Sequence, residues 1–95
     1  MPKPERLSPE QIASALATLS GWELANGKLH KKFVRANFND AFGFIARIAL
    51  LAEQMNHHPE LFNVFKNVTI DLTTHDCGGI SALDVELARK IDAVA

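Results

Sequence analysis

The chain has 95 residues, of which 47% are hydrophobic and 22% charged, and its formal net charge is −1 at pH 7. This length predicts one domain over residues 1–95, and the scattered, balanced charges argue against a nucleic-acid-binding surface. A single cysteine excludes an intrachain disulfide, no apolar run approaches the roughly 20 residues that cross a bilayer, and the N-terminus lacks the apolar core of a signal peptide, so we expect a cytoplasmic protein without membrane contact.

The first third of the chain predicts a helix followed by a β-hairpin. Residues 8–11, Ser-Pro-Glu-Gln, form a helix-capping box with proline at the first helical position, and Gly21 is expected to end this helix. A short strand opens at Trp22, and Asn26-Gly27 is the strongest turn signal in the chain, because both residues tolerate positive φ. The returning strand covers residues 28–35, and we interpret its basic residues as a solvated face rather than a phosphate-binding patch.

The middle of the chain carries the clearest amphipathic helix pattern, with Asn37 placed to cap it. Its apolar residues recur at steps of three and four and are Phe38, Ala41, Phe42, Ile45, Ile48, Ala49 and Ala52. Phe44, Leu51 and Met55 widen this stripe, so we expect the helix to be covered on more than one side and to line a subunit interface. It should not pass residue 57, because a proline at residue 59 disfavours the helical conformation in the residue before it.

The last third predicts a second hairpin and a final helix. Residues 62–65 form a short strand, Lys66-Asn67 a tight turn, and residues 68–74 a strand in which apolar and polar residues alternate. Ser81 and Asp84 form another capping box, which begins the last helix. The order α-β-β-α-β-β-α predicts an α+β fold, a four-stranded antiparallel sheet with three helices packed on one face. The other face would be open to water or to a partner chain.

Three histidines are predicted to meet near one end of this sheet. His57 and His58 lie between the long helix and the second hairpin, and His75 follows the last strand. Because the ends of paired strands in a hairpin return to each other, His75 should approach the other two. Glu53 precedes His57 by four residues and so would share its side of the final helical turn.

Such a cluster has two chemical uses and one structural alternative. Imidazoles bind metals, and they also transfer protons near neutral pH. Adjacent histidines lack the i, i+4 spacing that directs two rings at one ion, so we favour proton transfer without a metal. The residues alone leave open that these side chains only cap the helix end. Trp22 likewise can lie in the core or wall a pocket for a flat ring, and His30 is interpreted as a surface residue.

The segment EQMNHHPELFNVFKNVTIDLTTHD, residues 53–76, resembles the signature of the pterin-4a-carbinolamine dehydratases, and residues 21–22, 39–50 and 77–81 resemble further family segments. The matching signature residues are Glu53, His57, His58, Pro59, Phe65, His75 and Asp84. The resemblance implies the fold given above, dimers that commonly form tetramers, and a reaction without metal or organic cofactor. It implies a 4a-hydroxytetrahydropterin substrate, the product of aromatic amino acid hydroxylases, which loses water to give a quinonoid dihydropterin that can be recycled.

The resemblance also implies roles for individual residues. We expect His57 and His75 to transfer protons, without assigning acid or base, and His58 to lie beside the leaving hydroxyl. Glu53 would hold His57 or fix its tautomer through a hydrogen bond. Substrate contacts are expected from the three histidines and from Trp22, Asn56, Thr73, Thr74 and Asp76, with Pro59 and Asp84 in support.

Three positions differ from residues that are frequent in the family. Asn56 stands where aspartate is frequent, Leu61 replaces a common tryptophan, and Phe65 replaces a common tyrosine. These changes remove a charge, a donor and a polar tip but leave the three imidazoles, so we expect activity with an altered substrate fit. Two alternatives stay open: a protein-binding module, since a relative serves as a dimerisation partner of a transcription factor, and pterin handling in molybdopterin metabolism.

Overall fold

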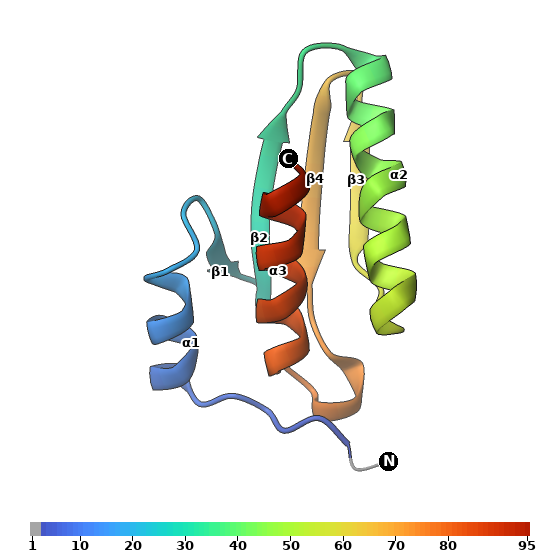
Figure 1. Ribbon diagram of the computed structural model, residues 1–95. Helices are drawn as coiled ribbons and strands as arrows, with labels where there is room; N and C mark the ends of the chain where they lie inside the picture. Colours follow the sequence, from blue (N-terminus) through green and yellow to red (C-terminus); the bar gives the residue numbers. More distant parts are fainter. Residues whose placement is uncertain (1–2) are drawn as a thin grey trace.

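The computed structural model describes residues 3–95 and confirms the predicted α+β fold (Figure 1). In chain order the elements are α1 (Pro9–Leu16), β1 (Glu23–Ala25), β2 (Lys28–Val34), α2 (Phe38–Met55), β3 (Glu60–Val64), β4 (Asn67–Leu72), a short 3-10 helix η1 (His75–Cys77) and α3 (Ala82–Val94). None of the helices in this described part combines the length and apolarity that a membrane span requires.

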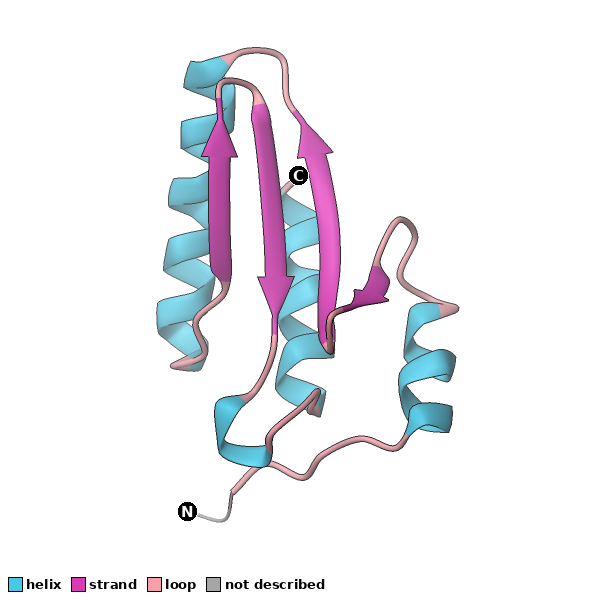
Figure 2. Ribbon diagram, turned by 180° about the vertical axis from the view of Figure 1, so that it is seen from behind, coloured by secondary structure: helices cyan, strands magenta, loops and turns pink. Residues whose placement is uncertain are grey.

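The four strands form one antiparallel sheet in the order β1-β2-β4-β3. Both predicted hairpins pair, and β2 joins β4 at the centre, so β3 is an edge strand. Helices α2 and α3 lie side by side over one face of the sheet, and α1 stands at the β1 end (Figure 1). No helix of the described chain covers the opposite face (Figure 2).

The core lies between the sheet and its two long helices. In β4 the apolar residues Val68, Ile70 and Leu72 are fully buried, and they alternate with half-buried polar residues as predicted. Against them pack Phe44 of α2, which meets Phe33 at a centroid distance of 4.9 Å, and Ile91 of α3. Burying each such side chain contributes about 1.5–3 kcal/mol, which fixes α2 and α3 on the sheet.

Several element boundaries differ from the prediction. Helix α1 ends at Leu16 rather than Gly21, and the Thr18 hydroxyl donates to the Ala15 carbonyl in the turns that follow. This local bond competes with continued helix. Strand β3 spans Glu60–Val64 instead of residues 62–65. It begins earlier, since Glu60 already pairs with Asp71, and it ends at Val64 because the turn to β4 begins at Phe65, where φ is +53°.

The predicted apolar face of α2 is partly wrong. Phe38 and Phe42 are 51% and 60% exposed, and Ala49 is also exposed, although all three were placed in the stripe. Phe44, predicted to widen the helix surface toward a partner, is fully buried inside the subunit. The helix is therefore apolar on two sides, and only the side centred on Phe44 and Ile48 faces the core.

Candidate active site

The histidine pair follows directly from the way α2 ends. Asn56 caps the helix in the left-handed conformation, with φ 50° and ψ 42°, a conformation that asparagine tolerates better than most residues. The chain turns there, so His57 lies outside the helix, held by a bond from its backbone N–H to the Ala52 carbonyl.

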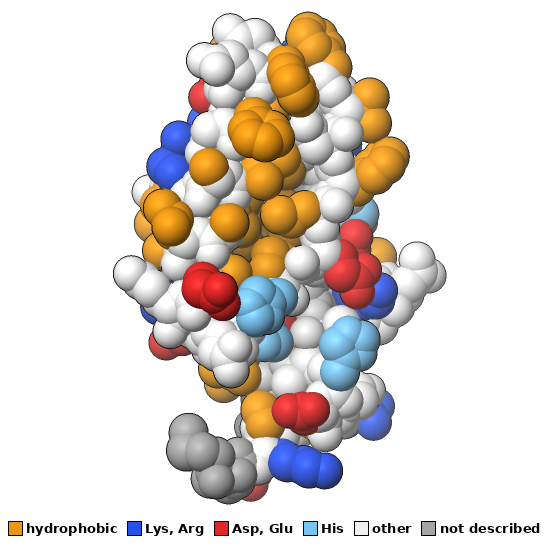
Figure 3. All heavy atoms as spheres, turned by 90° about the vertical axis from the view of Figure 1, so that its right-hand side faces the viewer, with side chains coloured by type: hydrophobic (Ala, Val, Ile, Leu, Met, Phe, Trp, Pro, Cys, Tyr) orange, Lys and Arg blue, Asp and Glu red, His pale blue; other side chains and the backbone are white. Residues whose placement is uncertain are grey.

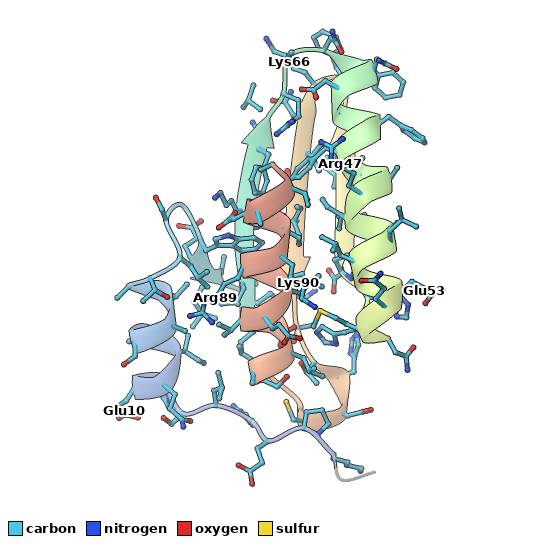
Figure 4. All side chains as sticks on the ribbon, in the orientation of Figure 1. Glu10, Arg47, Glu53, Lys66, Arg89 and Lys90 are labelled. Atoms are coloured by element: carbon cyan, nitrogen blue, oxygen red, sulfur yellow. The ribbon has the colours of Figure 1, made fainter. Side chains whose placement is uncertain are left out.

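This turn overturns the predicted pairing of Glu53. The i, i+4 relation holds only within a helix, and His57 has left it. Glu53 instead accepts a hydrogen bond from Nε2 of His58, over 3.1 Å between two exposed side chains. Figure 4 shows Glu53 on the outer side of α2, pointing away from α3. Exposed pairs of this kind contribute little energy, so Glu53 only biases the orientation of His58.

His57 is paired with Asp84, at the start of α3. Nε2 of His57 lies 2.6 Å from Oδ1 of Asp84. The other oxygen, Oδ2, accepts from the Ser81 backbone N–H at 3.0 Å and from the Thr74 hydroxyl at 2.7 Å. The predicted capping box of α3 is therefore present, and its carboxylate also serves the histidine.

The hydroxyl protons in this network can be assigned by counting. Thr74 has one hydroxyl proton and donates it to Asp84. The 2.7 Å bond between Thr74 and Ser81 must then be donated by the Ser81 hydroxyl, whose oxygen accepts from the Leu83 backbone N–H. Every proton has one acceptor, so the network has a single consistent direction that ends on Asp84.

The network is buried, and it leaves one nitrogen free for a ligand. Asp84 is 0% exposed and His57 8%. A buried carboxylate is stable only when hydrogen-bonded, and this one accepts three bonds. Across residues 3–95, every buried side-chain nitrogen and oxygen has a hydrogen-bond partner, whereas Nδ1 of His57 has none. This nitrogen is therefore reached by solvent.

A cleft of about 250 Å³ brings the predicted residues together. Strand register explains this, because Glu60 pairs with Asp71, so the residues after β4 lie beside those before β3. The cleft is lined by Pro4, Asn56, His57, His58, Thr73, Thr74, His75, Asp76 and Leu83. Figure 3 shows the histidine side chains gathered in pale blue below the apolar surface of this side of the molecule.

Two predicted residues lie elsewhere. Trp22, expected as a wall of the pocket, is a core residue 6% exposed, and its indole N–H is shared between the two carboxylate oxygens of Asp92, each at 3.1 Å. That prediction is wrong because Trp22 packs edge-on against Phe33 in the core. Phe65 lies at the β3–β4 turn, at the opposite end of β3 from His58.

Sequence reasoning missed three contributors to the site. Pro4 belongs to an arm that the sequence presented only as a loose end, and Leu83 appeared only as part of an apolar helix pattern. Ser81 was found as a helix cap, and its capping box was the one available signal of the buried network. Among residues 3–95, no group of three or more His, Cys, Asp or Glu side chains is arranged to hold a metal ion.

Comparison with known proteins gives a consistent result. Residues 5–94 match the family model described as pterin 4 alpha carbinolamine dehydratase. Proteins of Solibacter usitatus and of Bradyrhizobium sp. strain ORS 278, both named "Putative pterin-4-alpha-carbinolamine dehydratase", are 57% and 52% identical to it; the matches cover 95% and 96% of this chain and 95% and 93% of theirs. A crystal structure of a transcriptional coactivator/pterin dehydratase from Brucella melitensis superimposes with a TM-score of 0.92 at 40% identity, covering 96% of this chain and 99% of that one. The chain therefore belongs to the pterin 4 alpha carbinolamine dehydratase family.

Proposed function

We propose that the chain is a hydro-lyase that dehydrates 4a-hydroxytetrahydropterins to quinonoid dihydropterins, as in pterin recycling after aromatic amino acid hydroxylation. The observation that carries the proposal is the cleft that His57, His58 and His75 line together, with His57 paired to a buried carboxylate. Family membership supplies the substrate class, and the cleft supplies groups suited to proton transfer.

The reaction needs one acid and one base. The bond between C4a and the hydroxyl oxygen breaks, and the leaving oxygen takes a proton to become water. The proton on N5 is removed, and its electron pair forms the new C4a=N5 double bond. The acid gives one proton to the leaving oxygen, and the base takes one proton from N5. After the reaction the acid regains a proton from solvent and the base releases its proton to solvent.

The hydrogen-bond network favours His57 as the base. Oδ2 of Asp84 already accepts from two donors, and Oδ1 accepts the hydrogen bond that Nε2–H of His57 donates. The neutral ring then carries its lone pair on Nδ1, the solvent-reached nitrogen, where it can receive the N5 proton. His75, exposed on η1 at the cleft, would protonate the leaving hydroxyl, and His58 would orient it.

Stopped-flow dehydration of chemically generated 4a-hydroxytetrahydropterin tests this proposal. His57→Ala and His75→Ala should each lower kcat by roughly 10²–10⁴-fold, the usual contribution of a general acid or base. His30→Ala is the matched control, because His30 lies on β2, pairs with Asp71 of β4 and does not line the cleft. Normal turnover in both cleft variants, or an equal loss in the control, would refute the assignment.

We further propose that the chain forms a homodimer or homotetramer through β3 and the neighbouring surface of α2. An edge strand presents unpaired backbone groups, and β3 also exposes Phe62 by 65% and Val64 by 54%. On α2, Phe42 and Leu50 are 60% and 69% exposed. Exposed apolar surface on both elements favours burial against a partner. A second copy of the same chain is the simplest partner, because homo-oligomers are the commonest protein assemblies.

Sedimentation equilibrium tests this interface. Phe62→Lys should produce monomers, because a charge would be buried in the contact. Leu24→Lys is the control, since Leu24 is 49% exposed on β1, the other edge strand. Dissociation by the control but not by Phe62→Lys would move the interface to β1.

A binding module is the second candidate, because the Brucella melitensis relative is described as a transcriptional coactivator as well as a pterin dehydratase. The same exposed apolar residues on α2 and β3 would then contact a foreign protein. A monomeric wild-type chain without pterin turnover, which forms a stoichiometric complex with another protein, would favour this function over the enzyme.

A further inference from the structure

A second cavity adjoins the histidine cleft. Its volume is about 750 Å³, and it lies between the N-terminal arm, the end of α2 and the start of α3. Four residues line both spaces, namely Pro4, Asn56, Asp76 and Leu83. The two spaces therefore adjoin along these residues, and the histidines line only the smaller space. We name the larger space the arm cavity.

The arm that walls this cavity is attached to the domain. The backbone N–H of Leu7 donates to the Ile80 carbonyl over 2.8 Å, and the Leu7 side chain packs against the core. Pro4, three residues before this anchor, has a fixed φ, which limits how far the arm can move. The arm cavity is thus bounded by positioned chain on all three sides.

The arm cavity is about three times as large as the histidine cleft, and this difference indicates which part of a ligand each space can hold. Pockets for small molecules usually measure about 300–1,000 Å³, and the histidine cleft falls below that range. The cleft suits a bicyclic ring held between the imidazoles, whereas the arm cavity is large enough for a further group. A pterin ring in the cleft can extend into the arm cavity only through a substituent.

We propose that the arm cavity is the subsite for the substituent on C6 of the pterin and that it favours an uncharged, mainly apolar substituent longer than methyl. This inference rests on the proposed function. The apolar walls of the arm cavity come from Leu7, Met55 and Leu83. The charged side chains that line it are Lys3, Glu5 and Asp76, whose formal sum is negative, so a carboxylate-bearing substituent gains no net attraction there.

Equilibrium binding of unreactive pterins, followed by their fluorescence, tests the subsite independently of turnover. The probes are 6-methylpterin and 6-propylpterin. Burying one methylene is worth about fourfold in affinity, so the propyl compound should bind roughly four- to fifteenfold more tightly, depending on how fully its two extra methylenes are covered.

Ala82→Phe should abolish this preference. Ala82 is exposed at the first position of α3 and lines the arm cavity but not the cleft, so the ring fills the cavity without disturbing the core. Ala13→Phe is the matched control, because it adds the same ring at an exposed position of α1 that lines neither space. The control should keep the wild-type preference.

The outcomes separate this inference from the proposed function. Equal affinities of the two pterins for the wild-type chain, or an unchanged preference in Ala82→Phe, would overturn the subsite even if the 4a-hydroxy-6-methyl substrate is dehydrated normally. Binding of the propyl compound with no dehydration of either 4a-hydroxy substrate would keep the subsite and refute the enzyme. Failure of both pterins to bind would overturn both.

Discussion

Replacing Asp84 with asparagine should separate the shape of the buried network from its charge. The side chain keeps its size, and its amide oxygen can still accept from the Ser81 backbone N–H and the Thr74 hydroxyl. The amide NH₂ then faces Nε2 of His57, which must become an acceptor. The ring proton of His57 then moves to Nδ1, the nitrogen that we propose as the base. Nδ1 no longer has a lone pair that could accept the N5 proton of the substrate.

The expected loss is in turnover rather than in folding. A histidine base held in the wrong tautomer costs roughly 10⁴-fold where an equivalent aspartate has been replaced in another enzyme class, and general bases as a group contribute about 10²–10⁴-fold. Asp84→Asn should therefore lower kcat by roughly 10²–10⁴-fold. Three charge-assisted bonds become neutral ones, but each group keeps a partner, so the free energy of unfolding should fall by only about 1–3 kcal/mol.

Asp84→Ala provides the contrast. It removes the acceptor of three buried donors, and turning the Thr74 hydroxyl toward Ser81 would only displace the Ser81 hydroxyl proton from its own acceptor. Three unsatisfied donors at about 1–3 kcal/mol each give a loss of about 3–9 kcal/mol. That is a large fraction of the roughly 5–14 kcal/mol expected for 95 residues.

The assays are urea unfolding, for stability, and stopped-flow dehydration, for kcat. Turnover in Asp84→Asn within threefold of wild type, with the fold intact, would refute the tautomer argument and with it the assignment of His57 as the base. Similar free energies of unfolding for Asp84→Asn and Asp84→Ala would contradict the statement that the asparagine variant keeps the buried hydrogen bonds that the alanine variant loses.

Two further predictions concern residues outside the cleft. Trp22→Phe should lower the free energy of unfolding by about 1–2 kcal/mol through loss of a hydrogen bond to a partly exposed carboxylate, with kcat/KM within twofold of wild type; a tenfold fall in kcat/KM would mean that Trp22 contacts substrate. The pKa of Asp40 is lowered from its usual 3.8 by the Ala36 backbone N–H and then by the Arg35 side chain. The ionised form of Asp40 therefore stabilises the fold above pH 3.8, and this contribution disappears as the pH falls below that value. Thermal unfolding should show Asp40→Asn less stable than wild type at pH 7, with the gap closing below pH 3.8, and a gap independent of pH would contradict this account.

Local signals in the sequence predicted most of the fold. Capping boxes at Ser8 and Ser81, the Asn26-Gly27 turn and the alternation in β4 each depend on residues within four positions of one another. Such features follow from backbone geometry and from hydrogen bonds made within one turn. The same locality predicted that the ends of the second hairpin would bring His75 to the histidine pair.

The errors arose where the outcome depended on non-local packing or on one backbone angle. The left-handed conformation of Asn56 moved His57 off the helix, so an argument from helical spacing gave it the wrong partner. Along α2, Phe42 and Phe44 are equally apolar, and no local rule decides which of them faces the sheet. For Trp22, the deciding contact with Asp92 spans 70 residues of sequence.

Asp84 has one role that follows from local sequence and another that follows from non-local packing. Asp84 lies three residues after Ser81, and its carboxylate accepts from the backbone N–H of this N-cap residue, a role that any short acidic side chain at that position fulfils. The role toward His57 follows only because α3 packs beside α2, which places the start of one helix against the end of the other. The carboxylate that caps the helix is therefore also the acceptor that holds His57, and a variant that removes this carboxylate should affect folding and proton transfer together.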